Sequence, residues 1–433
     1  MIQLGEILQS VRVPPKHIDD YIPFVGEERI NNLKKLAEPL KNKRVLNLNA
    51  TAYGGGVAEL LKTQVALMDD LGLDVDWYVI NGDPEFYEVT KMFHNNLQGH
   101  PEVLTEDQKK IYLDTVRQNA KGLVENYDFV IVHDPQPLAI LEYIPAPTGR
   151  WIWRCHIDTS EPNIDTWNFL YPYMKNYDAV IFTLDEFVKD GTELKNITFI
   201  PPSIDPLSPK NSEMAKDEVD KLMRSYNVDP NRPIITQVSR FDPWKDPLGV
   251  IDVYRNIKYR PHANIDIKGL QLVMVGSMAN DDPEGWIVYD RVMRKVGEDF
   301  DINVYTNFHN VGDVGVNAFQ HAANVILQKS LKEGFGLTVA EGLWKGKPLI
   351  GGKVGGIKIQ VKDGENGFLV TNIKEATEKT LYLLEHPDEA EKMGKNGKEL
   401  VREKFLSIRE IEDHLNLFNK LQNKPCSTAF CNS

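Results

Sequence analysis

From residue 44 onward, short apolar runs alternate with segments in which apolar residues recur every three or four positions. The first pair is the run from Arg44 to Asn49 and the helical pattern from Val57 to Leu71, which Gly72 ends. Strands that alternate with helices predict an α/β protein with parallel sheets and crossover connections. On this basis we expect strands at 44–49, 75–80, 128–133, 150–156, 179–183, 197–200, 233–238, 271–275, 302–306, 324–328, 347–350 and 367–370.

A proline-rich segment, Pro201 to Pro209, divides this pattern into two halves. It is too rich in proline for a helix or a central strand, so we place the link between two domains there. In open parallel sheets, ligands bind beyond the carboxyl ends of the strands, and two such domains facing each other would form one deep cleft. We expect domains over 1–203 and 204–406, a helix over 407–424 that packs across a domain surface, and a disordered tail over 425–433.

Composition narrows the class of protein. Of 433 residues, 42% are hydrophobic and 26% are charged, which is ordinary for a globular enzyme. The 50 basic and 63 acidic residues give a net charge of −13, which argues against nucleic-acid or acidic-membrane partners. Cys155, Cys426 and Cys431 are too few to define a zinc site or a disulfide framework. No signal-peptide pattern and no apolar run of membrane-spanning length is visible, so we expect a cytoplasmic soluble protein.

Two glutamates stand eight positions apart after the expected strand at 324–328. Glu333 precedes the turn Gly334-Phe335-Gly336, and Glu341 lies inside the helix expected from Thr338 to Trp344. Glycines let a backbone approach a ligand closely, and the free N–H groups at a helix start favour an anion. The alternative is a surface loop before an amphipathic helix. We expect both carboxylates to flank one binding site.

Two cations follow the expected strand at 233–238. Arg240 and Lys245 are five residues apart in one loop. The arginine fork and the lysine charge are suited to a diphosphate, whose departure they would stabilise. Taken without the other motifs, a solvated basic loop would be an equal alternative.

Glycines and histidines mark strand ends in the first half. Gly54, Gly55 and Gly56 follow the first strand; they do not form G-x-G-x-x-G, so a dinucleotide site is disfavoured, but they can meet a phosphate or a substrate. A tight strand-to-helix turn is the alternative.

His133 and Asp134 end one expected strand, and His156 and Asp158 end the next, just after Arg154. A single histidine at a strand end is more often structural. Two His–Asp pairs on strands expected to be neighbours favour a site, in which either histidine could hold a substrate hydroxyl or move a proton.

Together these segments resemble the trehalose glycosyltransferring synthases, which are retaining GT-B glycosyltransferases of family 4. The likeness extends from about Ile18 to Leu421. It is carried by the segments at 132–137 (VHDPQP), 153–158 (WRCHID), 237–245 (QVSRFDPWK) and 333–341 (EGFGLTVAE), of which HDPQP and RCHID are typical of this subgroup.

The resemblance implies a GT-B fold with two Rossmann-like domains, and transfer of glucose from a nucleoside diphosphate glucose to free glucose. The N-terminal domain would be the acceptor side and the C-terminal domain would bind the nucleotide sugar. Implied catalytic residues are Arg240, Lys245, Glu333 and His156. Implied substrate-binding residues are Gly54, Gly55, Gly56, His133, Asp134, Arg154, Asp158, Gly334, Phe335, Gly336, Leu337, Thr338 and Glu341, the last at the ribose.

Several alternatives stay open at this point. A trehalose phosphorylase would use the same site with glucose 1-phosphate or phosphate, and a sugar-nucleotide-binding regulator would not catalyse at all. UDP-, ADP- and GDP-glucose are not distinguished by the sequence. We expect no tightly bound cofactor and no metal site, with Mg²⁺ on the diphosphate and a homodimer left open.

Overall fold

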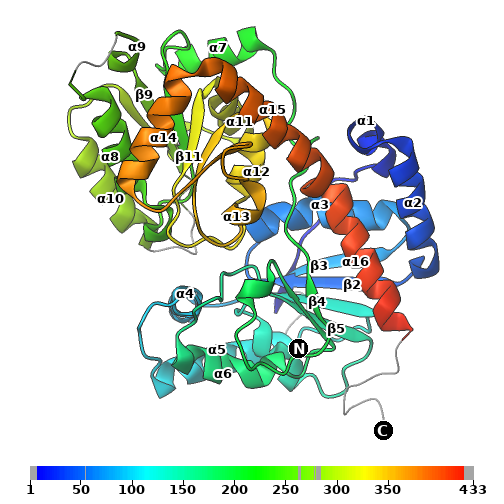
Figure 1. Cartoon of the computed structure of the whole chain (residues 1–433). Coiled ribbons are helices and arrows are strands. Elements are labelled where there is room, and N and C mark those ends of the chain that lie inside the picture. The colour runs from blue at the N-terminus through cyan, green and yellow to red at the C-terminus, as the bar shows by residue number, and fades with distance from the viewer. Residues whose placement is uncertain (1–6, 54, 262–264, 277, 279–283, 424–433) are drawn as a thin grey trace. The chain divides into compact units, whose positions relative to one another are not determined.

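The computed structural model in Figure 1 describes residues 7–53, 55–261, 265–276, 278 and 284–423. The chain forms two compact units. The first contains residues up to Pro202 together with those from Ser407 onward, and the second contains Ser203–Leu406. The chain thus leaves the first unit once and returns to it with its last helix.

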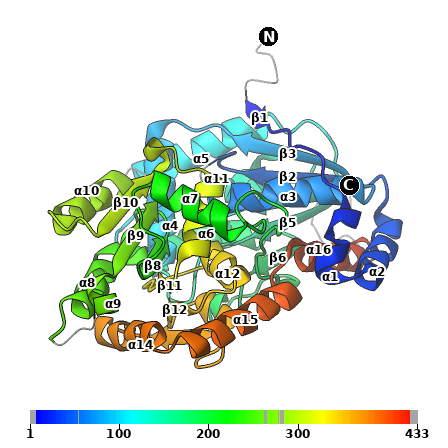
Figure 2. The same ribbon diagram turned by 90° about the horizontal axis from the view of Figure 1, so that it is seen from above.

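The first unit is built on a seven-stranded sheet in the order β1-β3-β2-β4-β5-β6-β7. All neighbours are parallel except β1, which runs antiparallel to β3 at one edge of the sheet (Figure 2). The strands are β1 (Leu8–Ser10), β2 (Arg44–Asn49), β3 (Asp74–Ile80), β4 (Phe129–His133), β5 (Arg150–Arg154), β6 (Ala179–Phe182) and β7 (Ile197–Phe199).

Helices cover both faces of this sheet. Successive residues of a strand point to opposite faces, so Ile131 packs in one apolar core while its neighbours Val130 and Val132 pack in the other. The α-helices are α1 (Ile22–Val25), α2 (Glu27–Ala37), α3 (Gly56–Asp70), α4 (Pro84–Leu97), α5 (Glu106–Ala120), α6 (Ile164–Met174) and α16 (Ser407–Gln422). The 3₁₀ turns are η2 (Ile18–Tyr21), η3 (Glu38–Leu40), η4 (Leu138–Tyr143) and η5 (Asp185–Phe187).

The second unit holds a six-stranded parallel sheet in the order β10-β9-β8-β11-β12-β13. Its strands are β8 (Ile234–Val238), β9 (Gln271–Gly276), β10 (Ile302–Thr306), β11 (Val325–Gln328), β12 (Leu349–Gly352) and β13 (Gly367–Val370). Its helices are α7 (Lys216–Ser225), η6 (Pro243–Lys245), α8 (Pro247–Lys258), α9 (Ile265–Lys268), α10 (Glu284–Val296), η7 (Asn307–His309), α11 (Asp313–Ala322), α12 (Leu337–Trp344), α13 (Ile357–Gln360), α14 (Ile373–Glu385) and α15 (Pro387–Lys404).

The structure confirms the α/β class with two parallel-sheet domains and all twelve expected strands, within one or two residues at each end. The sequence analysis missed β1, which has three residues, too few for an alternating pattern to be visible. The expected last helix is α16, and it packs against α2 and α3 of the first unit (Figure 1). The tail at 425–433 lies outside the described residues.

Candidate active site

The two predicted phosphate-binding cations lie at the carboxyl end of β8 in the second unit. Asp242 caps the turn η6 by accepting from Trp244 N at 2.8 Å, and Arg240 Nη2 lies 3.6 Å from the same carboxyl group. Lys245, the last residue of η6, donates from Nζ to Glu333 Oε2 at 2.5 Å. The structure therefore brings Lys245 and Glu333 together, although the sequence analysis treated them as separate motifs.

Glu333 is held in place by its own strand-end turn. Ser330 Oγ lies 3.2 Å from Glu333 Oε2, and the Glu333 carbonyl accepts from Gly356 N at 3.1 Å. The Glu333 side chain is 11% exposed, so its position is fixed by packing as well as by these contacts. A carboxylate held this firmly is suited to accept hydroxyl hydrogen bonds from one orientation of a sugar.

The turn after Glu333 ends in a left-handed residue. Gly336 has φ of +83° and precedes α12 without any side chain capping that helix. Phe335 is buried, and a Cβ at Gly356 would lie 2.3 Å from its Cα. No side chain caps the first residues of α12, Leu337 and Thr338. The backbone N–H groups at such a helix start favour an anion.

Glu341 lies deeper in the second unit than Glu333. It is 1% exposed, and Gln320 Nε2 donates to its Oε2 at 2.9 Å. Lys210 Nζ lies 3.8 Å from Oε1 of the same carboxylate and 3.9 Å from Asp313 Oδ1. The Lys210 side chain keeps 18% exposure, so this cation is the more accessible member of the ion pair.

In the first unit, the two predicted histidines meet. β4 and β5 are neighbours, and His133 Nδ1 lies 3.0 Å from His156 Nε2, with the rings stacked at 5.4 Å between centroids. His133 Nε2 lies 3.1 Å from Asn47 Oδ1 on β2. With that oxygen as acceptor, His133 carries its proton on Nε2 and accepts from His156 at Nδ1. His133 is 3% exposed, so His156 is the more accessible ring.

Asp134 occupies the left-handed region with φ of +63° directly after β4. Its Oδ1 accepts from His156 N at 2.8 Å, and its own N–H donates to the Arg154 carbonyl. Burial raises the pKa of Asp134 to about 7, against the opposing effects of the His156 amide and the Arg154 charge. This carboxyl group therefore titrates in the range in which enzymes commonly exchange protons.

Both histidines are held neutral. Burial lowers the pKa of His133 and of His156 well below the ordinary value, and the positive charge of Arg154 lowers both further. A neutral imidazole has one N–H donor and one acceptor nitrogen, so it can either donate a hydrogen bond to a hydroxyl group or accept one from it.

Arg154 and Asp158 are buried, unlike His156. Arg154 is 1% exposed and its guanidinium faces Glu410 of α16, with Nη2 3.8 Å from Oε1. Asp158 is 2% exposed, and its Oδ1 accepts from both N–H and Oγ of Ser160 at 3.1 and 2.6 Å. These contacts are made within the first unit itself, and they support the strand-end loop.

The glycine loop is described only in part. Gly55 is the N-cap of α3 and Gly56 its first residue, so the loop leads into a helix start at the carboxyl end of β2. Gly54 lies outside the described residues.

Sequence reasoning missed the residues that contact the predicted ones from elsewhere in the chain. Lys210 and Gln320 surround Glu341, Asn47 meets His133, and Glu410 lies beside Arg154. None of them belongs to a motif. Only the strand position of Asn47, a polar residue within an apolar run, gives a local signal.

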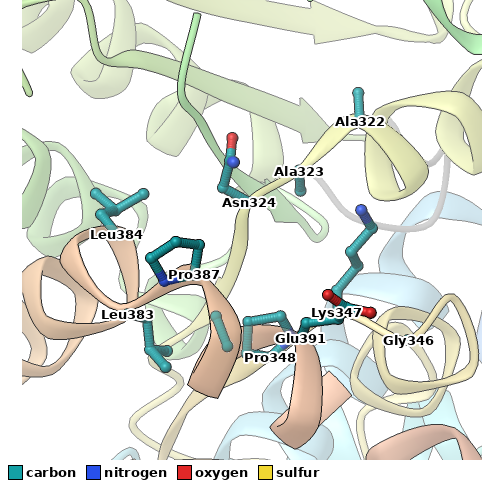
Figure 3. Close-up of a pocket in the computed structure, with 11 residues that line it drawn as sticks. Ala322, Ala323, Asn324, Gly346, Lys347, Pro348, Leu383, Leu384, Pro387 and Glu391 are labelled. Atoms are coloured by element: carbon teal, nitrogen blue, oxygen red, sulfur yellow. The ribbon is translucent and has the colours of Figure 1, made fainter. Parts of the chain in front are cut away.

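A pocket elsewhere in the second unit holds about 230 Å³ (Figure 3). Asn324 and Pro348, which line it, precede the first residues of β11 and β12, so the pocket lies at the amino ends of these strands. Ligands of open parallel sheets bind at the opposite edge. In the described part of the chain, no cluster of three potential metal-binding side chains occurs, and no helix has the length and apolarity to span a membrane.

Comparison with known proteins places this arrangement in a family. Residues 47–189 match the family model for the N-terminal domain of trehalose synthase, and residues 218–400 match that of group 1 glycosyl transferases. The trehalose synthase of Thermococcus litoralis is 49% identical over 406 residues, covering 93% of this chain and 97% of that protein. The chain belongs to the trehalose synthase family of glycosyltransferases.

More distant proteins also match this chain, one in sequence and one in structure. A trehalose phosphorylase of Pleurotus pulmonarius is 29% identical over 82% of this chain and 54% of its own length. The structure of a sucrose-phosphate synthase from Thermosynechococcus elongatus matches with a TM-score of 0.68 at 18% identity, covering 88% of this chain and 99% of that one. Family membership confirms the resemblance seen in the motifs, the GT-B fold, and trehalose-related glycosyl transfer as the activity class.

Proposed function

We propose that the protein transfers an α-glucosyl group from a nucleoside diphosphate glucose to the anomeric hydroxyl of free glucose, with retention, and so makes α,α-trehalose. The bond between glucose C1 and the diphosphate oxygen breaks, and a bond between C1 and the acceptor oxygen forms. The acceptor proton leaves with the nucleoside diphosphate. The reaction is proposed to be reversible.

The arrangement of Glu333 and Glu341 carries this proposal. Glu333 contacts Lys245 at the strand-end loop, whereas Glu341 lies one turn into α12 beside Gln320. Two separate carboxylates suit a donor that presents two sets of hydroxyls, one on glucose and one on ribose. Inorganic phosphate would use the cations but not Glu341, so this arrangement favours the nucleotide-dependent reaction over phosphorolysis.

The roles of the other residues follow from charge. Arg240 and Lys245 would bind the diphosphate and stabilise the negative charge that grows as it leaves. The uncapped start of α12 would add backbone donors to the same group. A Mg²⁺ ion, if used, would be held by the diphosphate itself.

In the first unit, neutral His156 would bind a hydroxyl of the reacting sugar, with His133 behind it and Asp134 holding its amide. We propose same-face substitution through an oxocarbenium-like state, in which a departing phosphate oxygen takes the acceptor proton. Retention then needs no covalent intermediate on a carboxylate.

A product assay tests the proposal. One tube holds protein, glucose and a mixture of UDP-, ADP- and GDP-glucose; a second holds glucose 1-phosphate and glucose; a third holds trehalose and phosphate. Protein carrying Lys245→Ala, purified in parallel, controls for contaminating enzymes. Trehalose formed with an equal amount of free nucleotide supports the proposal and identifies the base.

Other outcomes select the alternatives. Turnover only in the tubes with glucose 1-phosphate or phosphate would make the protein a phosphorylase and would assign Arg240 and Lys245 to phosphate. If all tubes are silent while nucleotide sugar still binds, the protein uses another acceptor or is a non-catalytic binding protein. Retention is tested separately, by the anomeric configuration of the product in proton NMR.

A further inference from the structure

Lys210 lies between two carboxylates in the second unit, and no motif of the sequence includes it. Its Nζ is 3.8 Å from Oε1 of Glu341 and 3.9 Å from Oδ1 of Asp313, the first residue of α11. The Glu341 side chain is 1% exposed, whereas that of Asp313 is 62% exposed. The ammonium group of Lys210 therefore lies between a buried carboxylate and one that is open to solvent.

The backbone on both sides of Lys210 is bound to α11 and α12. Asn317 of α11 donates from Nδ2 to the carbonyl before Lys210 and to the carbonyl two residues after it, at 3.0 and 2.8 Å. Trp344 of α12 donates from Nε1 to the carbonyl of Asn211 at 3.0 Å. Because Glu341 also lies on α12, these hydrogen bonds fix the backbone of Lys210 relative to that carboxylate.

The distance between Lys210 and Glu341 differs from that of an ion pair that forms a hydrogen bond. Hydrogen bonds from an ammonium group to a carboxylate are about 2.7–2.9 Å long. Lys398 contacts Glu213, three residues beyond Lys210, at 2.5 Å. At 3.8 Å, Lys210 Nζ and Glu341 Oε1 attract each other without a hydrogen bond between these two atoms.

This spacing suits a hydroxyl group that binds between the two atoms. Gln320 Nε2 donates to Glu341 Oε2 at 2.9 Å, which leaves Oε1 as the oxygen beside Lys210. A hydroxyl group has one hydrogen to donate and two lone pairs that accept. Because Lys210 Nζ and Glu341 Oε1 are 3.8 Å apart, one hydroxyl oxygen can lie within about 3 Å of both. Such a hydroxyl would donate to the carboxylate and accept from the ammonium group.

We propose that Lys210 is a second ribose-binding residue, which shares one ribose hydroxyl of the nucleoside diphosphate glucose with Glu341. The inference rests on the proposed function, in which Glu341 binds that ribose. It adds a residue from the segment that follows the crossing between the two units. A site that binds a hydroxyl with buried polar groups rejects analogues without it, so the pair selects ribose over deoxyribose.

A lysine near a bound diphosphate can also act by its charge alone. Its charge would attract every form of the nucleotide equally, whatever hydroxyls the ribose carries. A shared hydrogen bond acts only on the form that has the hydroxyl. The quantity that separates the two effects is therefore the preference for the ribonucleotide, expressed as the ratio of dissociation constants of the deoxy form and the ribonucleotide.

Calorimetric titration measures this preference. The wild type is titrated with UDP, ADP and GDP, and then with the 2′-deoxy and 3′-deoxy forms of the nucleotide that binds most tightly. The same nucleotide and its two deoxy forms are titrated into Lys210→Met, in which an apolar side chain of similar length replaces the lysine. Unfolding temperature is recorded for each protein.

We expect the wild type to prefer the ribonucleotide over one of the two deoxy forms by at least about 100-fold, because two hydrogen bonds to charged groups are lost with the hydroxyl. Lys210→Met keeps only the bond to Glu341, so its preference should be lower by about tenfold or more. An unchanged preference would overturn the proposal. Equal weakening of all three nucleotides would also overturn it, since Lys210 would then act only by its charge.

Lys398→Met is the matched control. It removes the lysine that binds Glu213, and so loosens the same segment without changing the surroundings of Glu341. Its preference for the ribonucleotide should equal that of the wild type. If Lys398→Met lowers the preference as much as Lys210→Met does, the effect comes from the looser segment and the proposal is wrong.

A second pair of variants covers a failure to fold. Lys210→Met leaves the buried Glu341 without its neighbouring cation, which is costly. If that variant does not fold, Glu341→Gln is compared with Lys210→Met/Glu341→Gln, neither of which buries a carboxylate at this position. A lower preference in the double variant supports the proposal, and equal preferences overturn it. If no nucleotide binds the wild type, the proposed function fails as well, whereas binding with an unaltered preference refutes this inference alone.

Discussion

Lys245 Nζ and Glu333 Oε2 lie 2.5 Å apart in the second unit, although 88 positions separate the two residues in the chain. The contact joins the loop after β8 to the turn after β11, strands that are neighbours in the sheet. A cation next to a carboxylate is held in a fixed position before any donor arrives. The Lys245 side chain therefore loses little further conformational freedom when a diphosphate binds to it.

Loss of either cation should slow the reaction. We expect Arg240→Ala and Lys245→Ala each to lower kcat/KM by about 10²–10³, the range for removal of one group that stabilises a developing charge. Lys395→Ala serves as the control, because Lys395 forms a comparable pair with Glu391 at 2.6 Å on the exposed face of α15. Steady-state kinetics with the preferred donor decide the matter. Near-normal kcat/KM in Arg240→Ala would remove that residue from the leaving-group role.

Glu341 should act on the nucleotide and not on glucose. Hydrogen bonds to a charged group contribute about 1.5–3 kcal/mol, so we expect Glu341→Gln to weaken nucleoside diphosphate binding by about 10–100-fold. The KM for acceptor glucose should not change. Calorimetric titration with the free nucleotide measures the effect. Unaltered affinity would mean that Glu341 only supports Gln320 and α12.

Gly336 offers a test of the turn before α12. Alanine at a left-handed position costs about 1–2 kcal/mol wherever it occurs, so Gly336→Ala and Gly364→Ala, with φ of +83° and +78°, should lose similar stability. A Cβ at Gly336 would also lie 3.2 Å from Glu333 Cγ, whereas one at Gly364 would meet nothing within 4 Å.

We therefore expect only Gly336→Ala to lose activity beyond what its lower stability explains. Urea unfolding and kcat, measured on both variants at a temperature where each is folded, separate the two effects. Equal activity in the two variants would show that the position of Glu333 tolerates a shift of several tenths of an ångström.

Asp134 should make stability depend on pH. Its pKa rises from an ordinary 3.8 to about 7 on folding, so between these values the folded state binds a proton that the unfolded state has lost. The stabilisation is complete below pH 3.8 and is lost as the pH rises through 7. Asp134→Asn keeps an oxygen for the His156 amide and removes the titration.

Unfolding temperature from pH 5 to 8 should consequently fall less in Asp134→Asn than in the wild type. Asp165→Asn, at an exposed position in the first turn of α6, is expected to follow the wild-type curve. The histidines contribute equally to all three curves, so the difference isolates Asp134. Parallel curves for the wild type and Asp134→Asn would mean that burial does not raise the pKa of the Asp134 carboxyl group.

Much of the fold could be read from the sequence because each parallel strand is a short, continuous apolar run. Strands such as β4 and β8 are buried at every residue, so their sequences differ clearly from the amphipathic helices between them. β1 escaped detection because three residues at a sheet edge, with one buried side chain, carry no such contrast. The division into two units falls where proline excludes helix and central strand.

The groups that end parallel strands could be predicted as site residues for the same reason. His133 ends a recognisable strand, and His156, Arg240 and Glu333 each follow one. Parallel strands end at one edge of their sheet. What they contact could not be predicted. Local patterns fix which residues point toward an edge, but they contain no information on distances between loops.

The sequence by itself thus determined twelve of the thirteen described strands, the two sheets, the family and the chemical character of the strand-end loops. Only the tertiary structure decided that Lys245 meets Glu333, that His133 lies behind His156, and that Glu410 of the last helix faces Arg154. The physical reason is that apolar periodicity is a property of neighbouring residues. A contact between charged side chains depends instead on how whole elements pack, and the carboxylate that lies beside Arg154 belongs to a residue 256 positions further along the chain.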